Sequence, residues 1–164
     1  MIVQVADGGD EGRNDDPALP TYQQDLWINE TLAKGQAMDY RIMVFHRALY
    51  SSYGNDDGLI NRFMPILVHY NVSILFYGHE HGYERFYIQN RNLICLAGGG
   101  GLLSGYLSWQ AGNQAMAVVP SFTKVTVDET GITITTLTPT MNVVDSIKLV
   151  KTGSNVVPEH VVEA

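Results

Sequence analysis

The sequence has little cysteine, few basic residues and no long apolar run, and each shortage excludes a class of protein. Its 164 residues contain one cysteine, so no intrachain disulfide framework is possible, and the apolar setting of Cys95 predicts a buried thiol. Ten Lys and Arg against 17 Asp and Glu give a net charge of −7, which argues against nucleic acid as the main partner. No stretch has the roughly 18 to 20 apolar residues of a membrane span, so we expect no membrane partner.

The length and composition are typical of one globular domain. Hydrophobic residues make up 45% of the chain and charged residues 16%, which is enough apolar material for a core. We expect this domain to span residues 1–151 and the last residues, 152–164, to form a flexible tail. The sequence shows no signal peptide, because no basic region precedes an apolar one, and the localisation stays unknown.

The front half of the chain alternates predicted strands and helices. Apolar runs in "MIVQVAD", "YRIMVFHRA", "VSILFYGHEH" and "RNLICLAGGGG" predict buried strands. Apolar residues at helical spacing predict helices near residues 21–34 and 59–70. Gly35 should stop the first helix, and Pro65 should kink or break the second.

The back half has the pattern of an antiparallel β region. "SFTKVTVDETGITITTLT" alternates β-branched and polar residues on both sides of a turn at residues 128–131, and "NVVDSIKLVK" adds a strand. The predicted fold class is therefore α/β, with a βαβ front half and antiparallel β hairpins at the C-terminal end. In such folds ligand sites form beyond the carboxyl ends of the strands.

Three of the five histidines lie at such strand ends. His46 closes one predicted strand, and His79 and His81 follow the next. An H-x-H sequence in extended backbone presents both imidazoles to one face, and imidazole is a common transition-metal ligand. We expect these three side chains to point into one shared pocket, although any one of them alone could be an ordinary loop or core histidine. His69 and His160 match no motif and are interpreted as structural or exposed.

Two segments resemble a known family. "VFHRALYSSYG" and "ILFYGHEHGYERF" are similar to the C-terminal half of a calcineurin-like metallophosphoesterase, in particular the purple acid phosphatase branch, where G-H-x-H-x-Y-E-R is characteristic. "YQQDLWINETLA" resembles the family's Q-x-x-W-L helix, "AGGGG" its glycine-rich strand end, and "GITITTLTPTMNVVDSIKL" its closing hairpin. The resemblance covers most of residues 1–150 and implies a partial metallophosphoesterase-type sandwich.

The resemblance also implies an activity, a phosphatase or phosphodiesterase that hydrolyses phosphoesters through a dinuclear metal centre. It implies that His46 and His79 bind one metal and His81 the other, the two metals being divalent or trivalent Zn, Fe or Mn. The resemblance further implies that three residues support the loop, namely Tyr83, Glu84 and Arg85. The catalytic residues stay unknown. Relatives in this family are often secreted.

The family's earlier metal motifs are absent upstream of these segments. Neither an Asp-bearing first strand, nor a G-D motif with a bridging aspartate, nor a G-N-H/D motif occurs in the expected order, and "GGD" at 8–10 and "GND" at 54–56 are interpreted as chance matches. A partial sandwich should expose a sheet edge and an apolar face. We therefore expect either a homo-oligomer or a complementary N-terminal chain that carries the missing motifs.

Two other classes of function stay open. A non-catalytic metal-binding or assembly module would keep the histidines without turnover. A β-rich structural domain with vestigial histidines would bind no metal. A metal assay separates the structural domain from the other two classes, and turnover of an aryl phosphate separates an enzyme from an assembly module.

Overall fold

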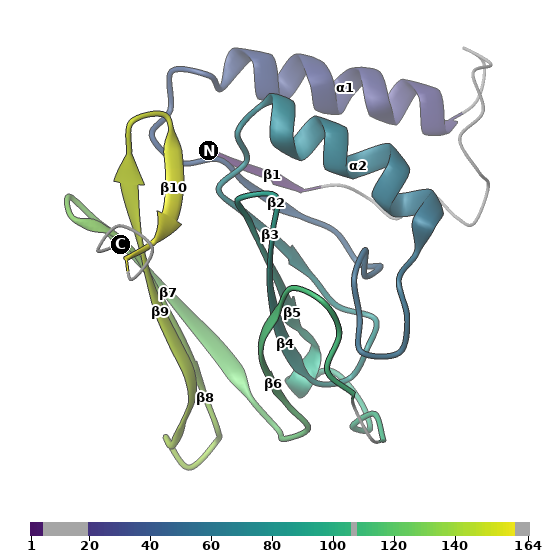
Figure 1. Cartoon of the computed structure of the whole chain (residues 1–164), viewed down its shortest axis with the longest axis vertical. Helices are drawn as coiled ribbons and strands as arrows, with labels where there is room; N and C mark the ends of the chain where they lie inside the picture. The colour runs from purple at the N-terminus through teal and green to yellow at the C-terminus, as the bar shows by residue number, and fades with distance from the viewer. Residues whose placement is uncertain (5–19, 106–107, 160–164) are drawn as a thin grey trace.

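The chain folds into three layers, two helices above a six-stranded sheet that packs on a four-stranded sheet (Figure 1). The computed structural model describes residues 1–4, 20–105 and 108–159. Within them, helix α1 (Pro20–Lys34) and helix α2 (Asp57–His69) cover one face of the larger sheet. This arrangement confirms the predicted α/β class with a C-terminal antiparallel sheet.

The larger sheet mixes parallel and antiparallel strands. Its spatial order is β1 (Ile2–Gln4), β2 (Ile42–Val44), β3 (Ile74–Tyr77), β5 (Arg91–Leu96), β4 (Tyr83–Ile88) and β6 (Asn113–Ala117). Strands β1, β2, β3 and β5 are parallel, and β4 lies antiparallel between β5 and β6. The carboxyl ends of β2 and β3 therefore lie side by side at the same end of the sheet, and the loops that follow these strands carry His46 and His79.

The smaller sheet is antiparallel throughout. Its order is β10 (Asn155–Pro158), β9 (Val143–Thr152), β8 (Gly131–Leu137) and β7 (Phe122–Asp128), which confirms the hairpin turn at residues 128–131. The prediction of a flexible tail from residue 152 is wrong as far as Pro158. Strand β10 is held because Val156 is buried in the core between the sheets. Residues 160–164 lie outside the described part of the chain.

Two apolar clusters hold the three layers together. Between the helices and the larger sheet lie Val3, Ile28, Leu32, Met43, Phe45, Leu49, Phe63, Met64, Leu67, Val72, Leu75, Tyr77, Phe86, Leu93 and Cys95. Between the two sheets, Ile42, Ile74 and Ile94 pack against Ile132 and Ile147. The expectation of an uncovered sheet face is therefore wrong, because the chain's own C-terminal sheet buries that face of the larger sheet.

Backbone capping defines where helix α1 ends. The Gly35 N–H donates to the Thr31 carbonyl at 3.1 Å, at the position where the sequence predicts the stop. The buried Arg41 guanidinium then donates to the carbonyls of Gly35, Gln36 and Met38. These carbonyls lie in the turn after the helix, so the guanidinium fixes the connection between α1 and β2. In the described residues no helix is both long and apolar enough to cross a membrane.

Helix α2 runs unbroken through Pro65, so the predicted break is not found. Pro65 and Asn61, the residue whose carbonyl loses its helical N–H partner, both lie on the exposed face of the helix. Asp56 caps the start of the helix, its Oδ1 accepting from the Leu59 N–H at 2.9 Å. His69 is exposed at the end of the helix with its ring against Tyr70, and His160 lies outside the described residues.

Strand β7 is the outer strand of the smaller sheet, and all but one of its residues are exposed. Val125 and Val127 pair with the buried Ile134 and Ile132, so they share the inner face, yet they are 38% and 54% exposed. An unpaired edge with apolar side chains is a template for strand pairing. Of the edge strands, β7 combines its unpaired backbone with two exposed valines on the inner face, which makes it a candidate for the expected association.

We therefore expect the chain to self-associate through β7. Lysine at both Val125 and Val127 should shift the protein toward monomer, because a charged edge resists pairing. Light scattering at several protein concentrations measures the mass, and Thr133→Lys on the neighbouring strand serves as the control. An unchanged mass in the double variant would place the association elsewhere.

Candidate metal centre

The loops that follow β2 and β3 bring His46 and His79 together. Nε2 of His46 lies 3.4 Å from Nδ1 of His79, and the two rings meet edge to face at 89°. Two nitrogen ligands of one tetrahedral metal, with bonds of roughly 2.0–2.1 Å, lie about 3.4 Å apart. The pair therefore has the spacing of two ligands on a single ion.

The backbone around His79 is specialised. Its φ of 74° lies in the left-handed region, which is uncommon for a residue other than glycine and recurs at functional sites. The preceding N–H, of Gly78, donates to the carbonyl of His46 at 2.9 Å. The two histidine-bearing loops are therefore joined through their backbones as well as through their rings.

His81 is held by the glycine-rich segment after β5. Its backbone N–H donates to Ser104 Oγ, its carbonyl accepts from the Ser104 N–H, and its Nδ1 lies 2.6 Å from the carbonyl of Leu102. Gly101 has no room for a side chain, since a Cβ there would lie 2.5 Å from Cε1 of His81. A carbonyl at Nδ1 places the ring proton on that atom and leaves the lone pair on Nε2, an arrangement common among metal-binding histidines.

The structure thus groups two of the three predicted histidines. Among the described residues, no set of three or more His, Cys, Asp or Glu is placed to hold one metal ion. The expectation of one pocket shared by all three rested on their common position at strand ends, with period-two alternation placing His79 and His81 on one face. That alternation fails because β3 ends at Tyr77 and the left-handed backbone of His79 interrupts the extended chain before His81.

The single cysteine contacts the backbone of the loop that carries His79 and His81. Cys95 is buried, as predicted, and its thiol donates to the carbonyl of Glu80, with the carbonyls of Gly78 and Gly82 also near Sγ. Burial raises the pKa of Cys95 to about 12. The thiol is therefore protonated at neutral pH, which suits a structural role and not metal ligation.

A pocket of about 430 Å³ opens beside His79. Its lining consists of Arg47, Ala48, Ser51, Tyr53, Gly54, Asn55, Asp56, Asp57, His79 and Glu80. Arg47 forms an ion pair with Asp56 at 2.8 Å, and a guanidinium is suited to binding a phosphate. The lining carboxylates repel an anion, so phosphate binding here needs a cation that offsets them.

The predicted supporting residues lie in a strand and not in a loop. Tyr83, Glu84 and Arg85 form the first half of β4 and are only 1%, 1% and 9% exposed. The signal for this strand was present in the aromatic-rich "YERFYI", followed by a two-residue turn in which Gln89 and Asn90 both have positive φ.

Comparison with known proteins identifies the fold. No family model and no curated protein matches the sequence. Solved structures do match the chain, and two of them align over most of its length. GAP50, the anchor in the inner membrane complex of Plasmodium, aligns with a TM-score of 0.73 at 19% identity over 85% of this chain and 46% of its own. Purple acid phosphatase PPD1 from yellow lupin (Lupinus luteus) seeds aligns with a TM-score of 0.71 at 21% identity, over 88% of this chain and 30% of its own.

The chain has a purple acid phosphatase-like fold. It spans less than half the length of either of these relatives. At such identities the likeness concerns the arrangement of strands and helices, and the chemistry has to be argued from the residues of this chain.

In this purple acid phosphatase-like fold, Glu84 links β4, the strand that follows His79 and His81, to the loop around Ser52 that lines the pocket. Its carboxylate accepts from the Ser52 N–H at 3.0 Å and from Ser52 Oγ at 2.6 Å. Burial raises the pKa of Glu84, while the hydrogen bonds from Ser52 oppose that rise. Because Ser52 lies between Ser51 and Tyr53, which both line the pocket, Glu84 fixes the wall of the pocket.

We expect Glu84→Ala to destabilise the protein by about 1–3 kcal/mol, because it leaves the buried Ser52 donors unpaired. Glu84→Gln should retain both bonds without the buried charge. A carboxyl whose pKa is raised by folding stabilises the fold most below its unfolded pKa, and loses this contribution as pH rises through the folded pKa. The wild type should therefore gain stability relative to Glu84→Gln as pH falls from neutrality. Urea titrations of both proteins at several pH values measure this difference in the free energy of unfolding. A difference that does not vary with pH would contradict this.

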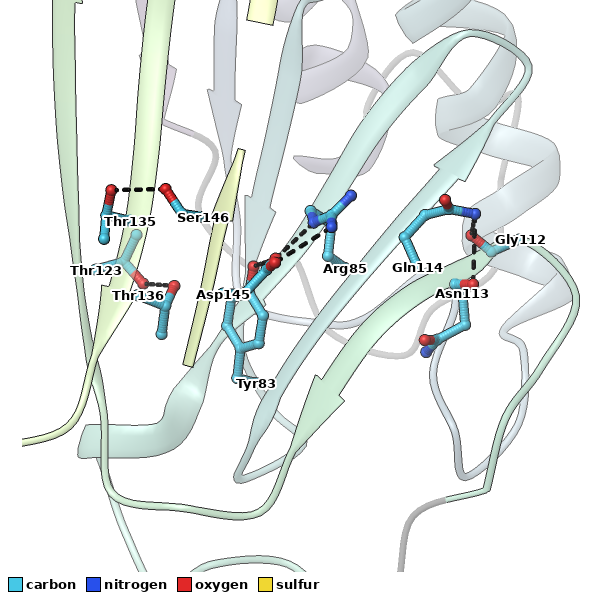
Figure 2. Close-up of polar contacts among 10 residues, drawn as sticks. All are labelled: Tyr83, Arg85, Gly112, Asn113, Gln114, Thr123, Thr135, Thr136, Asp145 and Ser146. Carbon is cyan, nitrogen blue, oxygen red and sulfur yellow. Dashed lines mark hydrogen bonds and ion pairs between the residues drawn. The ribbon is translucent and has the colours of Figure 1, made fainter. Parts of the chain in front are cut away.

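Tyr83 and Arg85 point from the other face of β4 toward the smaller sheet (Figure 2). Asp145 on β9 accepts from the Tyr83 hydroxyl at 2.7 Å and from Arg85 Nε at 2.6 Å and Nη2 at 3.3 Å. Burial and the neighbouring Asp145 carboxylate raise the pKa of Tyr83 well above its usual range, so the phenol stays protonated and donates. The strand that follows the histidines is thus attached to the layers on both of its faces.

Proposed function

We propose that this chain takes part in metal-dependent hydrolysis of phosphoesters, as a phosphatase or phosphodiesterase. The observation that carries the proposal is the 3.4 Å spacing between His46 Nε2 and His79 Nδ1, at the carboxyl edge of a purple acid phosphatase-like sheet. In this proposal His46 and His79 bind one metal and His81 binds a second through its Nε2. Imidazole ligands favour Zn, Fe or Mn over hard cations.

The donor set fits part of a dinuclear centre. When bound, such metals lower the pKa of a water and neutralise charge during in-line displacement at phosphorus. The chain's own residues then bind and orient the ester: Arg47 holds a phosphate oxygen beside His79, and Glu84 and Cys95 hold the two loops in place. The remaining ligands, a bridging carboxylate among them, would come from outside the described residues or from a complementary chain.

Zinc titration by calorimetry tests the ligand assignment directly. The wild type should bind zinc, and His46→Ala and His79→Ala should each weaken the same binding event strongly, because each removes one of two nitrogens on one ion. His69→Ala is the matched control, since His69 is also an exposed histidine. Equal affinities in all four proteins would contradict the assignment.

We expect any phosphoesterase activity to be lost on chelation and restored by Zn, Mn or Fe. Calcium should not restore it, because an imidazole-rich site suits borderline transition metals. Hydrolysis of a generic aryl phosphate, before and after dialysis against a chelator, measures this. Activity that survives thorough removal of metal would contradict a metal-dependent mechanism.

A second candidate is a metal-binding or assembly module without turnover. It is favoured by the likeness to GAP50, whose described role is that of an anchor, and by the exposed edge of β7. Zinc binding together with association, but without turnover of an aryl phosphate, would favour this function over hydrolysis.

A further inference from the structure

Hydrogen bonds of one residue, Ser52, hold the wall of the pocket in place. Its N–H and hydroxyl donate to Glu84, and its carbonyl accepts from Ser108 Oγ at 3.1 Å. Ser52 is buried, so these bonds are shielded from water. Two segments far apart in the sequence, around residues 52 and 108, are thereby held side by side at the pocket.

Each of these segments carries an exposed aromatic residue next to the bonded serine. Tyr53 follows Ser52 and lines the pocket at 49% exposure, and Trp109 follows Ser108 at 62% exposure. Neither belongs to the apolar clusters, and neither ring stacks on another aromatic ring within the described residues. Tyr53 belongs to the pocket lining, and Trp109 lies outside that lining on the segment bonded to Ser52. Exposed aromatic side chains held in this way are suited to stacking on a flat ligand.

The pocket is also larger than a phosphate needs. Its volume of about 430 Å³ lies in the range of pockets that hold drug-sized molecules, roughly 300–1,000 Å³. Arg47 offers a guanidinium to a phosphate on the side of the pocket near His79, and Tyr53 adds an aromatic surface to the same lining. The remaining space is therefore available to the group that the phosphate is attached to.

We propose that Tyr53 and Trp109 bind the leaving group of the substrate, and that the preferred substrates are phosphoesters of a flat aromatic ring. This inference rests on the proposed function, since it assigns a substrate class to that site. Tyr53 and Trp109 act as specificity residues: they stack on the ring while the phosphate lies toward Arg47. An ester with a small alkyl group would lack that contact and bind more weakly.

Phenylphosphonate and methylphosphonate test this preference without turnover, because the same head group carries a ring in one and a methyl group in the other. The full chain with Trp27→Phe has Trp109 as its only tryptophan, so fluorescence reports on this position alone. With stoichiometric zinc present, phenylphosphonate should bind about tenfold more tightly than methylphosphonate, a difference of about 1.4 kcal/mol, and should change the Trp109 emission.

Calorimetry on Tyr53→Ala and Trp109→Ala separates the possible outcomes. Both variants should lose most of the preference for phenylphosphonate and keep their affinity for methylphosphonate, whereas Met38→Ala, which removes an exposed apolar side chain outside the site, should keep the preference. Equal affinities of the wild type for the two phosphonates would overturn the inference and leave the proposed function standing. If neither phosphonate nor inorganic phosphate binds the zinc-loaded protein, the proposed function itself fails.

Discussion

Replacing Asp145 by alanine is expected to lower the free energy of unfolding by about 3–5 kcal/mol, the range for removing one partner of a buried ion pair. Asp145 accepts from both Arg85 and Tyr83, and the Arg85 side chain is only 10% exposed. The variant therefore leaves an uncompensated guanidinium and an unpaired phenol between two apolar sheets. Such a loss is a large share of the roughly 5–15 kcal/mol that holds a typical domain folded.

Urea denaturation followed by circular dichroism measures this effect, and companion variants identify its cause. Tyr83→Phe removes one hydrogen bond and should cost about 1 kcal/mol. The double variant Arg85→Met with Asp145→Leu should be more stable than Asp145→Ala, because no buried charge is left unpaired. A cost below about 1 kcal/mol for Asp145→Ala would mean that water reaches Arg85 and that the pair does not hold the sheets together.

The stretch from His79 to Arg85 joins the candidate site to the whole fold. Glu84 binds the pocket loop on the helix side of β4, and Arg85 binds the smaller sheet on the other side. Successive residues of a strand point to opposite faces, so adjacent charged residues can serve two layers. The geometry of His79 and His81 thus depends on contacts with residues 30 to 60 positions away.

Local patterns predicted most of the architecture. The buried strands β2, β3 and β5 and the hairpin of β7 and β8 follow directly from apolar runs and period-two alternation. Strand β4 was missed because two charged residues, Glu84 and Arg85, interrupt its apolar pattern. Their partners, Ser52 and Asp145, are distant in sequence, and only the folded chain shows that these charges are buried and paired.

The candidate site was predictable where it depended on topology and not where it depended on backbone dihedral angles. His46 and His79 meet because parallel strands end at the same edge. The contact between His81 and Leu102 depends on a left-handed residue and on a glycine without a side chain, Gly101. Neither feature follows from the spacing of the histidines.

Replacing His79 by alanine is expected to reduce kcat/KM for an aryl phosphate about a thousandfold or more in a complete, metal-loaded site. Such a loss corresponds to about 4 kcal/mol, which is in the range that a metal ion contributes to stabilising charge during phosphoryl transfer. His81→Ala should cost a similar amount through the second metal. The His69→Ala variant should remain within about twofold of the wild type, because His69 lies exposed at the end of α2 and does not line the pocket beside His79.

Comparing these variants separates a loss of catalytic activity from a loss of stability. His79 and His69 are both exposed, so neither alanine variant creates a cavity in the core. His79→Asn is a second variant at the critical position, since asparagine accepts the left-handed backbone readily but lacks the imidazole. It should be folded, with an unchanged urea midpoint, and as inactive and as weak in zinc binding as His79→Ala. Comparable losses at His79, His81 and His69 would instead show that the substitutions destabilise the fold, and metal ligation by the first two would then lack support.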